Sequence, residues 1–446
     1  MTENNESLRE KINKIKEGKK LLFNYNNIPE NIPKRMKKDI KIWDETLRDG
    51  EQTPGVGLTL EQKLDIIKIM DDMGIAVIVV GYPAVSEKDK SIVCSIAREK
   101  FKAKIAAPAR AHLNDVKVAV ECEVDEIPVF FPISDLSLKM VLKIDYEEAY
   151  KRIENAIQYV KDHGIVPDFV PVDASRTAPD KLIKFCKVAI EAGADKIDIA
   201  DTVGCMRPNS MKYLIRMILD HPDIPKDIII SPHCHNDFGL ATANTLAALE
   251  EGANYPHVTV NAFGERSGNA ALEEVVMALD CLYGIKTIKT ERLYELAELT
   301  EAYFGLPLSV HKAIVGVNSF SHESGLHIHA MISGGPWAIE PYNPRKIGRK
   351  RYFYMGKYSG RATIRYLLNQ AGIEATEEQI KAILNEVKSE PNKLTREEAL
   401  KTMKLIKDKI RESYRGIRPS KFWDIVYKIT GQKASDPYLL DKPVEL

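Results

Sequence analysis

Residues 227–237 read Asp-Ile-Ile-Ile-Ser-Pro-His-Cys-His-Asn-Asp. The run of isoleucines is typical of a buried β-strand, and the two histidines stand where that strand ends. Because side chains alternate along a strand, His233 and His235 point to the same face and Cys234 points to the other. Two imidazoles on one face suggest a metal site, although an isolated pair of this kind is more often explained by a core histidine bonded to backbone.

This run is the seventh of eight short β-branched segments that alternate with longer helical patterns. Helical spacing is clearest at residues 60–73 and 146–161. Eight strand-helix units between residues 39 and 284 favour an α/β fold, a closed parallel (β/α)8 TIM barrel, over an open sheet. The expected strands are residues 40–43, 77–80, 104–107, 126–130, 168–172, 196–199, 227–231 and 257–260.

Closure of such a barrel brings three polar motifs together. Catalytic groups of TIM barrels lie at the C-terminal ends of the strands, and strand eight returns between strands one and seven. Asp49 follows strand one and Asn269 follows strand eight, so both are expected beside His233 and His235. One carboxylate, two imidazoles and one amide oxygen suit a divalent ion such as Mn²⁺, Zn²⁺ or Mg²⁺.

Composition excludes several classes of function. The chain has 64 basic and 64 acidic residues, so its net charge gives no reason to expect nucleic acid or a membrane surface as a partner. Six cysteines without a Cys-x-x-Cys pair argue against a disulfide framework and favour a reducing cytoplasm. The polar N-terminus does not resemble a secretory signal, and the apolar runs are too short to span a bilayer.

The barrel has flanking segments of different character. Residues 1–38 are expected to form an N-terminal arm that begins with a charged, amphipathic helix. Residues 285–446 read as a mainly helical C-terminal domain, with charged helices over 375–415. Within it, residues 321–336 contain three histidines and are expected to form a loop.

Over residues 38–365 the sequence resembles the DRE-TIM metallolyase superfamily. Within that superfamily it is most similar to the acyl-CoA-condensing synthases that make 2-isopropylmalate, homocitrate and citramalate. The resemblance rests on five motifs, which are Leu-Arg-Asp-Gly-Glu-Gln-Thr-Pro-Gly (47–55), Asp-Thr-Val-Gly (201–204), His-Cys-His-Asn-Asp (233–237), Gly-Glu-Arg-Ser-Gly-Asn (264–269) and Ser-Gly-Leu-His (324–327).

The resemblance implies an acyltransferase that condenses acetyl-CoA with a 2-oxoacid and then hydrolyses the thioester. Its metal ligands fall on Asp49, His233, His235 and, more weakly, Asn269. Arg48 takes the position of the catalytic arginine, which stabilises the negative charge of the enolate and the alkoxide.

The family pattern also assigns residues outside the metal set. His327 takes the place of the base that removes a methyl proton from acetyl-CoA. Arg176 and Thr202 match contacts of the oxoacid carboxylate, and Gln52 is a further expected substrate contact. A homodimer is implied, in which the second domain of one chain reaches over the partner's barrel.

Several positions depart from the family pattern. Val79 and Val172 stand where glutamates are usual, and Ile339 stands near the place of an assisting tyrosine. Leu138 replaces an arginine that one subgroup of homocitrate synthases uses for a distal carboxylate. The apolar side chain favours an apolar acceptor such as 2-oxoisovalerate or pyruvate, because an unpaired second carboxylate is costly to bury.

Two other functions stay open on the sequence alone. A carbon-carbon lyase resembling hydroxymethylglutaryl-CoA lyase would carry a cysteine in the strand-eight loop, and residues 264–269 contain none. A diverged homologue that binds metal without turnover is favoured by the replacements at Val79, Val172 and Ile339. The helical pattern after residue 373 also predicts that no leucine-binding regulatory domain is present.

Overall fold

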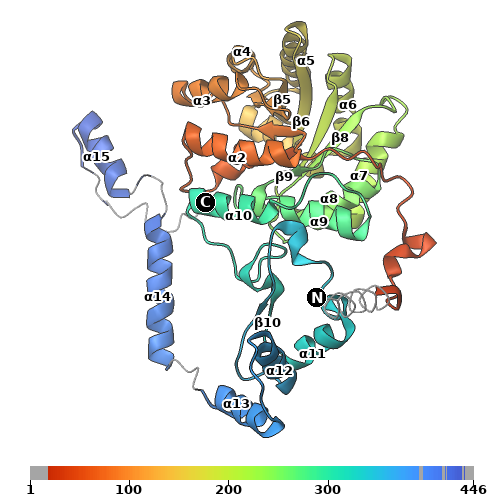
Figure 1. Cartoon of the computed structure of the whole chain (residues 1–446). Helices are drawn as coiled ribbons and strands as arrows, with labels where there is room; N and C mark the ends of the chain where they lie inside the picture. The colour runs from red at the N-terminus through yellow and green to blue at the C-terminus, as the bar shows by residue number, and fades with distance from the viewer. Residues whose placement is uncertain (1–18, 391–394, 414–416, 418, 434–435, 437–446) are drawn as a thin grey trace.

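The short β-branched segments of the sequence form a parallel barrel that helices surround (Figure 1). The structure is a computed structural model that describes residues 19–390, 395–413, 417, 419–433 and 436. The helix expected near the start of the N-terminal arm lies outside these residues. The eight-stranded α/β barrel and the helical C-terminal region that the sequence predicts are both confirmed.

The strands follow the order β8-β7-β6-β5-β3-β2-β1-β9, with the extra two-residue strand β4 paired to β5. The first strand begins later than the sequence indicates, because residues 40–42 are extended without forming a ladder. The bounds are β1 Trp43–Asp44, β2 Val77–Val79, β3 Lys104–Ala106, β4 Ala109–Arg110, β5 Glu126–Pro132, β6 Val166–Val172, β7 Lys196–Asp201, β8 Ile229–Cys234 and β9 His257–Val258.

The barrel closes between β8 and β9 without a regular ladder. β9 pairs in parallel with β1, with Trp43 opposite His257. On its other side, the amide of Asn254 donates to the carbonyl of Ile230 (3.1 Å), and the amide of Ala270 donates to that of Cys234 (3.2 Å). Loop backbone therefore forms this seam, and it places the segment around residue 269 beside the end of β8.

The helices around the barrel follow the apolar spacing of the sequence. Helix α2 begins with a capping box between Thr59 and Gln62 and ends at Gly74, whose φ of 90° places it in the left-handed region. No helix in the described part of the chain is long and apolar enough to cross a membrane. The bounds are α2 Leu60–Met73, α3 Glu87–Ala97, α4 Leu113–Val120, α5 Tyr146–Asp162, α6 Pro179–Glu191, α7 Pro208–Asp220, α8 Ala241–Glu250 and α9 Leu272–Leu282.

Alternation along the strands divides the core into two parts. Ile78 and Val80 join the large cluster between strands and helices, whereas Val77 and Val79 belong to a separate cluster with Trp43 and Ala106. Barrel interiors are usually filled by branched apolar side chains. Here the interior also buries polar groups, namely Glu126, Asp168, Lys196, Asp198, Ser231 and His257.

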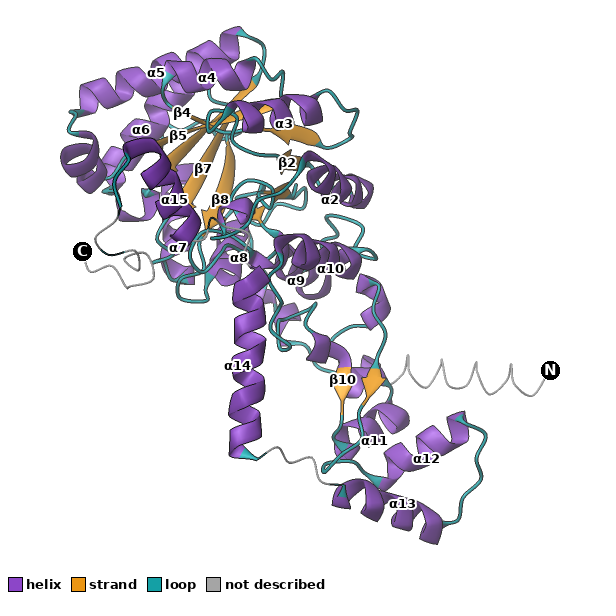
Figure 2. Cartoon of the chain, turned by 90° about the vertical axis from the view of Figure 1, so that its left-hand side faces the viewer, coloured by secondary structure: helices purple, strands orange, loops and turns teal. Residues whose placement is uncertain are grey.

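After α10, which packs on the barrel, the chain extends away to α11, α12 and α13, and α14 then runs back toward the barrel (Figures 1 and 2). The expectation of a loop over residues 321–336 is wrong, because a short strand and helix α11 form there. Ile328 and Met331, three residues apart, are the buried positions of that helix. The bounds are α10 Leu293–Phe304, β10 Ser321–His322, α11 Gly325–Gly334, β11 Tyr352–Phe353, α12 Arg361–Gln370, α13 Glu377–Ser389, α14 Arg396–Ser413 and α15 Pro419–Thr430.

One disulfide joins Cys94 on α3 to Cys122 just after α4, with Cα atoms 4.3 Å apart. The scattered cysteines of the sequence argue against a disulfide framework, and they did not predict this single bond. The two residues are 28 positions apart in the chain. They meet because consecutive helices pack side by side around a barrel, a proximity that cysteine spacing alone does not reveal.

Candidate metal centre

The structure brings together the three strongest ligands that the sequence predicts. Asp49 lies directly before the 3-10 turn η3 (Gly50–Gln52) after β1, while His233 and His235 lie at the end of β8. Asp49 Oδ2 is 3.2 Å from His233 Nε2 and 3.8 Å from His235 Nε2. All three ligand atoms lie within 4.8 Å of one another, close enough to share one ion with bonds of about 2.0–2.3 Å.

Asn269 completes the set from the far side of the seam. Its Nδ2 lies 3.3 Å from His233 Nε2 and 3.5 Å from Asp49 Oδ2, and its buried Oδ1 has no hydrogen-bond partner among the described residues. Rotating the amide by 180° exchanges these two atoms and presents the oxygen to an ion. A Cβ on Gly264 would lie 1.8 Å from this Oδ1, so the approach of Asn269 requires glycine there.

The protonation states of the ligands suit a cation. Burial opposes ionisation of Asp49, but the Arg48 guanidinium and the neighbouring imidazoles outweigh it and hold the pKa of this carboxyl well below its usual range. Burial, with the nearby imidazole of His233, lowers the pKa of His235 to about 4. At neutral pH the site therefore offers a carboxylate and an unprotonated imidazole, the forms that bind metal.

Arg48 is a fixed cation at the edge of the ligand set. Its Nε donates to Glu45 Oε2 at 2.8 Å, and its Nη1 donates to Asp49 Oδ2 at 3.3 Å. Burial disfavours the charge, but these two carboxylates outweigh burial and raise the pKa of Arg48 above its ordinary value. The guanidinium is thus charged, oriented and still in contact with the adjoining cavity.

A cavity of about 270 Å³ opens beside these residues, and its lining contains two groups of residues with different chemistry. We call one group the metal wall, formed by Glu45, Arg48, Asp49, His233, His235 and His257. We call the other the apolar wall, formed by Pro108, Pro128, Phe130, Val170, Val172 and Ala200. Gln52, Tyr82, Thr202, Glu265 and Arg266 complete the lining.

The remaining predicted substrate contacts are only partly gathered there. Gln52 and Thr202 line the cavity, and Thr202 Oγ1 accepts a hydrogen bond from the amide of Asp173 (2.8 Å). Arg176, on the turn η5 (Ala174–Arg176), lies outside the lining, and its Nε donates to Asp173 Oδ1 at 2.7 Å. Leu138 is buried in the π-helical turn η4 (Ser137–Leu142), also outside the lining.

His327 lies apart from the other predicted catalytic residues. It is exposed on α11, a helix that both views show well away from the barrel (Figures 1 and 2). The nearby His322 is instead held by Glu340, with Nε2 and Oε1 3.0 Å apart. Within the described chain, the ligand set and the expected base are therefore not assembled into one site.

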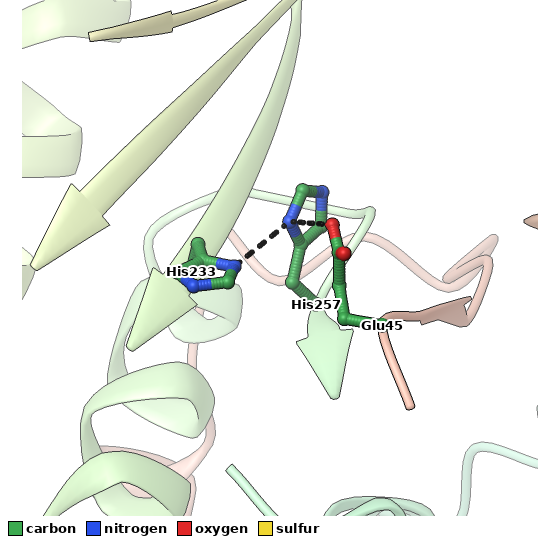
Figure 3. Close-up of side chains that lie close together, drawn as sticks. All are labelled: Glu45, His233 and His257. Atoms are coloured by element: carbon green, nitrogen blue, oxygen red, sulfur yellow. Dashed lines mark hydrogen bonds and ion pairs between the residues drawn. The ribbon is translucent and has the colours of Figure 1, made fainter. Parts of the chain in front are cut away.

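Sequence reasoning missed His257, which lines the cavity together with Glu45. His257 Nδ1 lies 3.3 Å from His233 Nδ1 and 3.5 Å from Glu45 Oε1 (Figure 3). A signal was available, because His257 begins the eighth predicted strand and its alternation with Val258 and Thr259 could have placed it inside the barrel.

Comparison with known proteins decides the family. The family model described as HMGL-like matches residues 39–300, and the model described as homocitrate synthase post-HMGL domain-like matches residues 314–394. The chain belongs to the HMGL-like family. The match to this family model confirms the resemblance to the DRE-TIM metallolyases. Members of the family depend on a divalent metal, which agrees with the clusters of possible metal ligands at the site.

Relatives of this HMGL-like chain cover most of its length. A 2-isopropylmalate synthase of Sulfurisphaera tokodaii is 43% identical over 353 residues, which are 79% of this chain and 90% of the relative. The homocitrate synthase AksA of Methanopyrus kandleri is 42% identical over 79% of this chain and 87% of its own length. The solved structure of hydroxymethylglutaryl-CoA lyase from Bacillus subtilis has a TM-score of 0.55 at 21% identity, over 62% of this chain and 97% of the lyase, and supports the fold alone.

Proposed function

We propose that this HMGL-like enzyme is an acyltransferase that condenses acetyl-CoA with a small apolar 2-oxoacid and then releases CoA by hydrolysis. The observation that carries the proposal is the cavity, whose lining combines a metal wall with an apolar wall. The metal wall suits the ketone and carboxylate oxygens of the acid, and the apolar wall suits its side chain. Membership of a family that includes 2-isopropylmalate and homocitrate synthases supports the reaction class.

Asp49, His233, His235 and Asn269 are the proposed metal ligands. Their mixed nitrogen and oxygen donors suit Mn²⁺, Zn²⁺ or Mg²⁺. A divalent ion bound there supplies Lewis acidity to the ketone of the 2-oxoacid and fixes which face is attacked. The protein contributes a preformed ligand set in which Asp49 is ionised and His235 is unprotonated at neutral pH.

Arg48 is the proposed stabiliser of negative charge during the condensation. Its Nε and Nη1 are committed to Glu45 and Asp49, so its orientation is set before substrate binds. Its Nη2 has no hydrogen bond to another described residue and is available to the oxygen of the enolate and then of the alkoxide. Gln52 and Thr202, at the rim of the cavity, are placed to orient the carboxylate of the oxoacid.

The apolar wall is the basis for the proposed acceptor. Among the described residues that line the cavity, the cationic side chains are Arg48, which is bound to two carboxylates, and Arg266, which is paired with Asp237 at 2.9 Å. A second carboxylate would therefore be buried without a free partner, at considerable cost in free energy. We expect 2-oxoisovalerate or pyruvate to be accepted and 2-oxoglutarate to be disfavoured.

Acetyl-CoA with a panel of 2-oxoacids tests this function directly. The metal-loaded enzyme should release free thiol at a rate that depends on an apolar acceptor, with 2-oxoglutarate at least about 100-fold poorer in kcat/KM. Omission of the acceptor controls for simple thioester hydrolysis. Thiol release only with 2-oxoglutarate would refute the acceptor assignment, and silence across the panel would favour a metal-binding homologue without turnover.

His327 is the proposed base, acting across a homodimer. It is exposed on α11, away from its own barrel, so we assign it to the cavity of the partner copy. Arg48→Ala and His327→Ala, each with strongly reduced activity alone, should then complement each other after subunit exchange and restore about a quarter of wild-type activity. Failure of the mixture to gain activity, with exchange verified by tagged subunits, would overturn this arrangement.

A further inference from the structure

His257 is held in place by its surroundings although no hydrogen bond to backbone fixes its ring in the described structure. It begins β9 and is only 3% exposed. Its ring stacks on Trp43, with centroids 4.8 Å apart and an angle of 15° between the planes. Its Nδ1 faces Nδ1 of His233 at 3.3 Å, and the two rings are nearly perpendicular (Figure 3).

This contact fixes the protons of both rings once His233 acts as a metal ligand. The Nε2 atom of His233 faces Asp49 and Asn269, so it is the nitrogen that must be unprotonated to bind an ion. The neutral ring then carries its proton on Nδ1 and donates it to His257. Two N–H groups cannot face each other at 3.3 Å, so Nδ1 of His257 is the acceptor and its own proton lies on Nε2.

The opposite edge of His257 meets a carboxylate suited to that proton. Nε2 of His257 lies 3.8 Å from Oδ1 of Asp198 on β7. Both carboxylate oxygens of Asp198 and Nε2 of His257 are buried, and none of them has a hydrogen-bond partner among the described residues. A shift of less than 1 Å, or one bridging water, would satisfy these groups together.

A second ion held by Glu45, His233 and His257 is a poorer explanation of the same cluster. Oε1 of Glu45 already accepts from Trp43 Nε1 at 3.1 Å, and Oε2 accepts from Arg48 at 2.8 Å. An ion there would also need His233 to lose the protons of both ring nitrogens, next to the cationic Arg48. The hydrogen bond between His233 and His257 leaves the bonds of Glu45 intact and removes only one proton from His233.

We propose that His257 is a positioning residue for the metal centre, in a relay that runs from His233 through His257 to Asp198. The relay selects the tautomer of His233, holds its ring toward Asp49 and makes Nε2 a stronger donor. This inference rests on the proposed metal centre. It goes beyond that centre by assigning a function to two buried residues that do not touch the ion.

Two amide substitutions test the relay because they place the same chemical group at different distances from the backbone of residue 257. In His257→Asn the amide oxygen occupies the position of Nδ1 and can still accept from His233, whereas in His257→Gln the amide extends to the position of Nε2. Protein stripped with a chelator is titrated with Mn²⁺ and with Zn²⁺ by calorimetry. We expect His257→Asn, which keeps the acceptor for His233 but loses the link to Asp198, to bind metal about threefold more weakly than wild type, and His257→Gln to bind it about 10–100-fold more weakly.

Controls separate positioning from general damage and from failure of the metal centre. Glu340→Gln alters a buried carboxylate of the C-terminal region, which lies 3.0 Å from His322, and should leave the affinity unchanged. The Co²⁺ visible spectrum of His257→Gln should shift from that of wild type, and the spectrum of His257→Asn should shift less. Equal affinities in the two amide variants, whether wild-type or weakened, would overturn the relay. Absence of metal binding by wild type would instead refute the metal centre itself.

Discussion

The two walls of the cavity are built from the same barrel but in different ways. The metal wall comes from β1, β8 and β9 and packs charged groups against one another, so that each fixes the orientation of the next. The apolar wall comes mainly from β5, β6 and β7 and contributes shape without charge. The difference indicates that reaction chemistry and acceptor choice are separable in this enzyme, and substitutions on each wall can test that separation.

The largest effect is expected on the metal wall, at a proposed metal ligand. His235→Ala removes one of three close donors, so metal affinity should fall by more than about 100-fold and activity should be lost with it. Calorimetry of the stripped protein and thiol release measure the two quantities. His311→Ala, at an exposed histidine, is the matched control. A variant that kept activity without metal would break the assignment of chemistry to this wall.

A smaller loss is expected at Arg48, without loss of metal. Arg48→Ala should lower kcat about 10²–10³-fold, because a positioned donor to the developing oxyanion is gone. Metal affinity should stay within about tenfold of wild type, since the ligand atoms remain. Arg48→Lys keeps the charge but not the fork that binds both Glu45 and Asp49, so it should recover only part of the rate. Normal turnover by Arg48→Ala would contradict its role.

The apolar wall should alter preference and not chemistry. Phe130→Ala enlarges the cavity and should shift the ratio of kcat/KM about 10–100-fold toward longer apolar 2-oxoacids, with metal affinity unchanged. The neighbouring Phe131 faces the outer core and provides the control, because Phe131→Leu should affect stability but not this ratio. An unchanged ratio in Phe130→Ala would show that the acceptor does not contact this wall.

The smallest effect concerns the buried carboxylate beneath the metal wall. Burial raises the pKa of Asp198 from 3.8 to about 7. Between these values the folded protein keeps a proton that the unfolded chain has lost, so this group makes stability fall as pH rises from about 4 to 7. Relative to wild type, Asp198→Asn should gain a few degrees in Tm on going from pH 5 to pH 8, in chelator. If the difference in Tm between Asp198→Asn and wild type were the same at both pH values, the raised pKa of Asp198 would be contradicted.

Much of the barrel could be predicted because it depends on the spacing of apolar residues and on the alternation of strands and helices along the chain. The isoleucine run before His233 and the helical spacing of residues 60–73 are local signals, and strand order then follows from closure. The segment around His327 was missed as a helix because flanking glycines and three histidines hide a short apolar period. The bond between Cys94 and Cys122 depends on the packing of two helices, which no local pattern encodes.

The site divides in the same manner. Asp49, His233, His235 and Asn269 were predictable because each lies at the end of a strand or in the loop that follows one, where barrel geometry brings side chains together. His257 was not, because its significance depends on a ring in the neighbouring strand and on the tautomer which that ring must adopt. Placement of Leu138 and Arg176 outside the lining likewise reflects loop conformation that sequence spacing does not determine.

The irregular seam between β8 and β9 means that the proposed ion would also stabilise the closure of the barrel. His233 and His235 stand on one side of that seam, and Asn269 stands on the other, with Asp49 next along the barrel. A cation bound by residues from both sides would link the two strands where the sheet has few backbone hydrogen bonds. Amide hydrogen exchange at Asn254 and Ala270, whose bonds cross the seam, should therefore quicken when metal is removed, while exchange within the β5–β6 ladder stays slow.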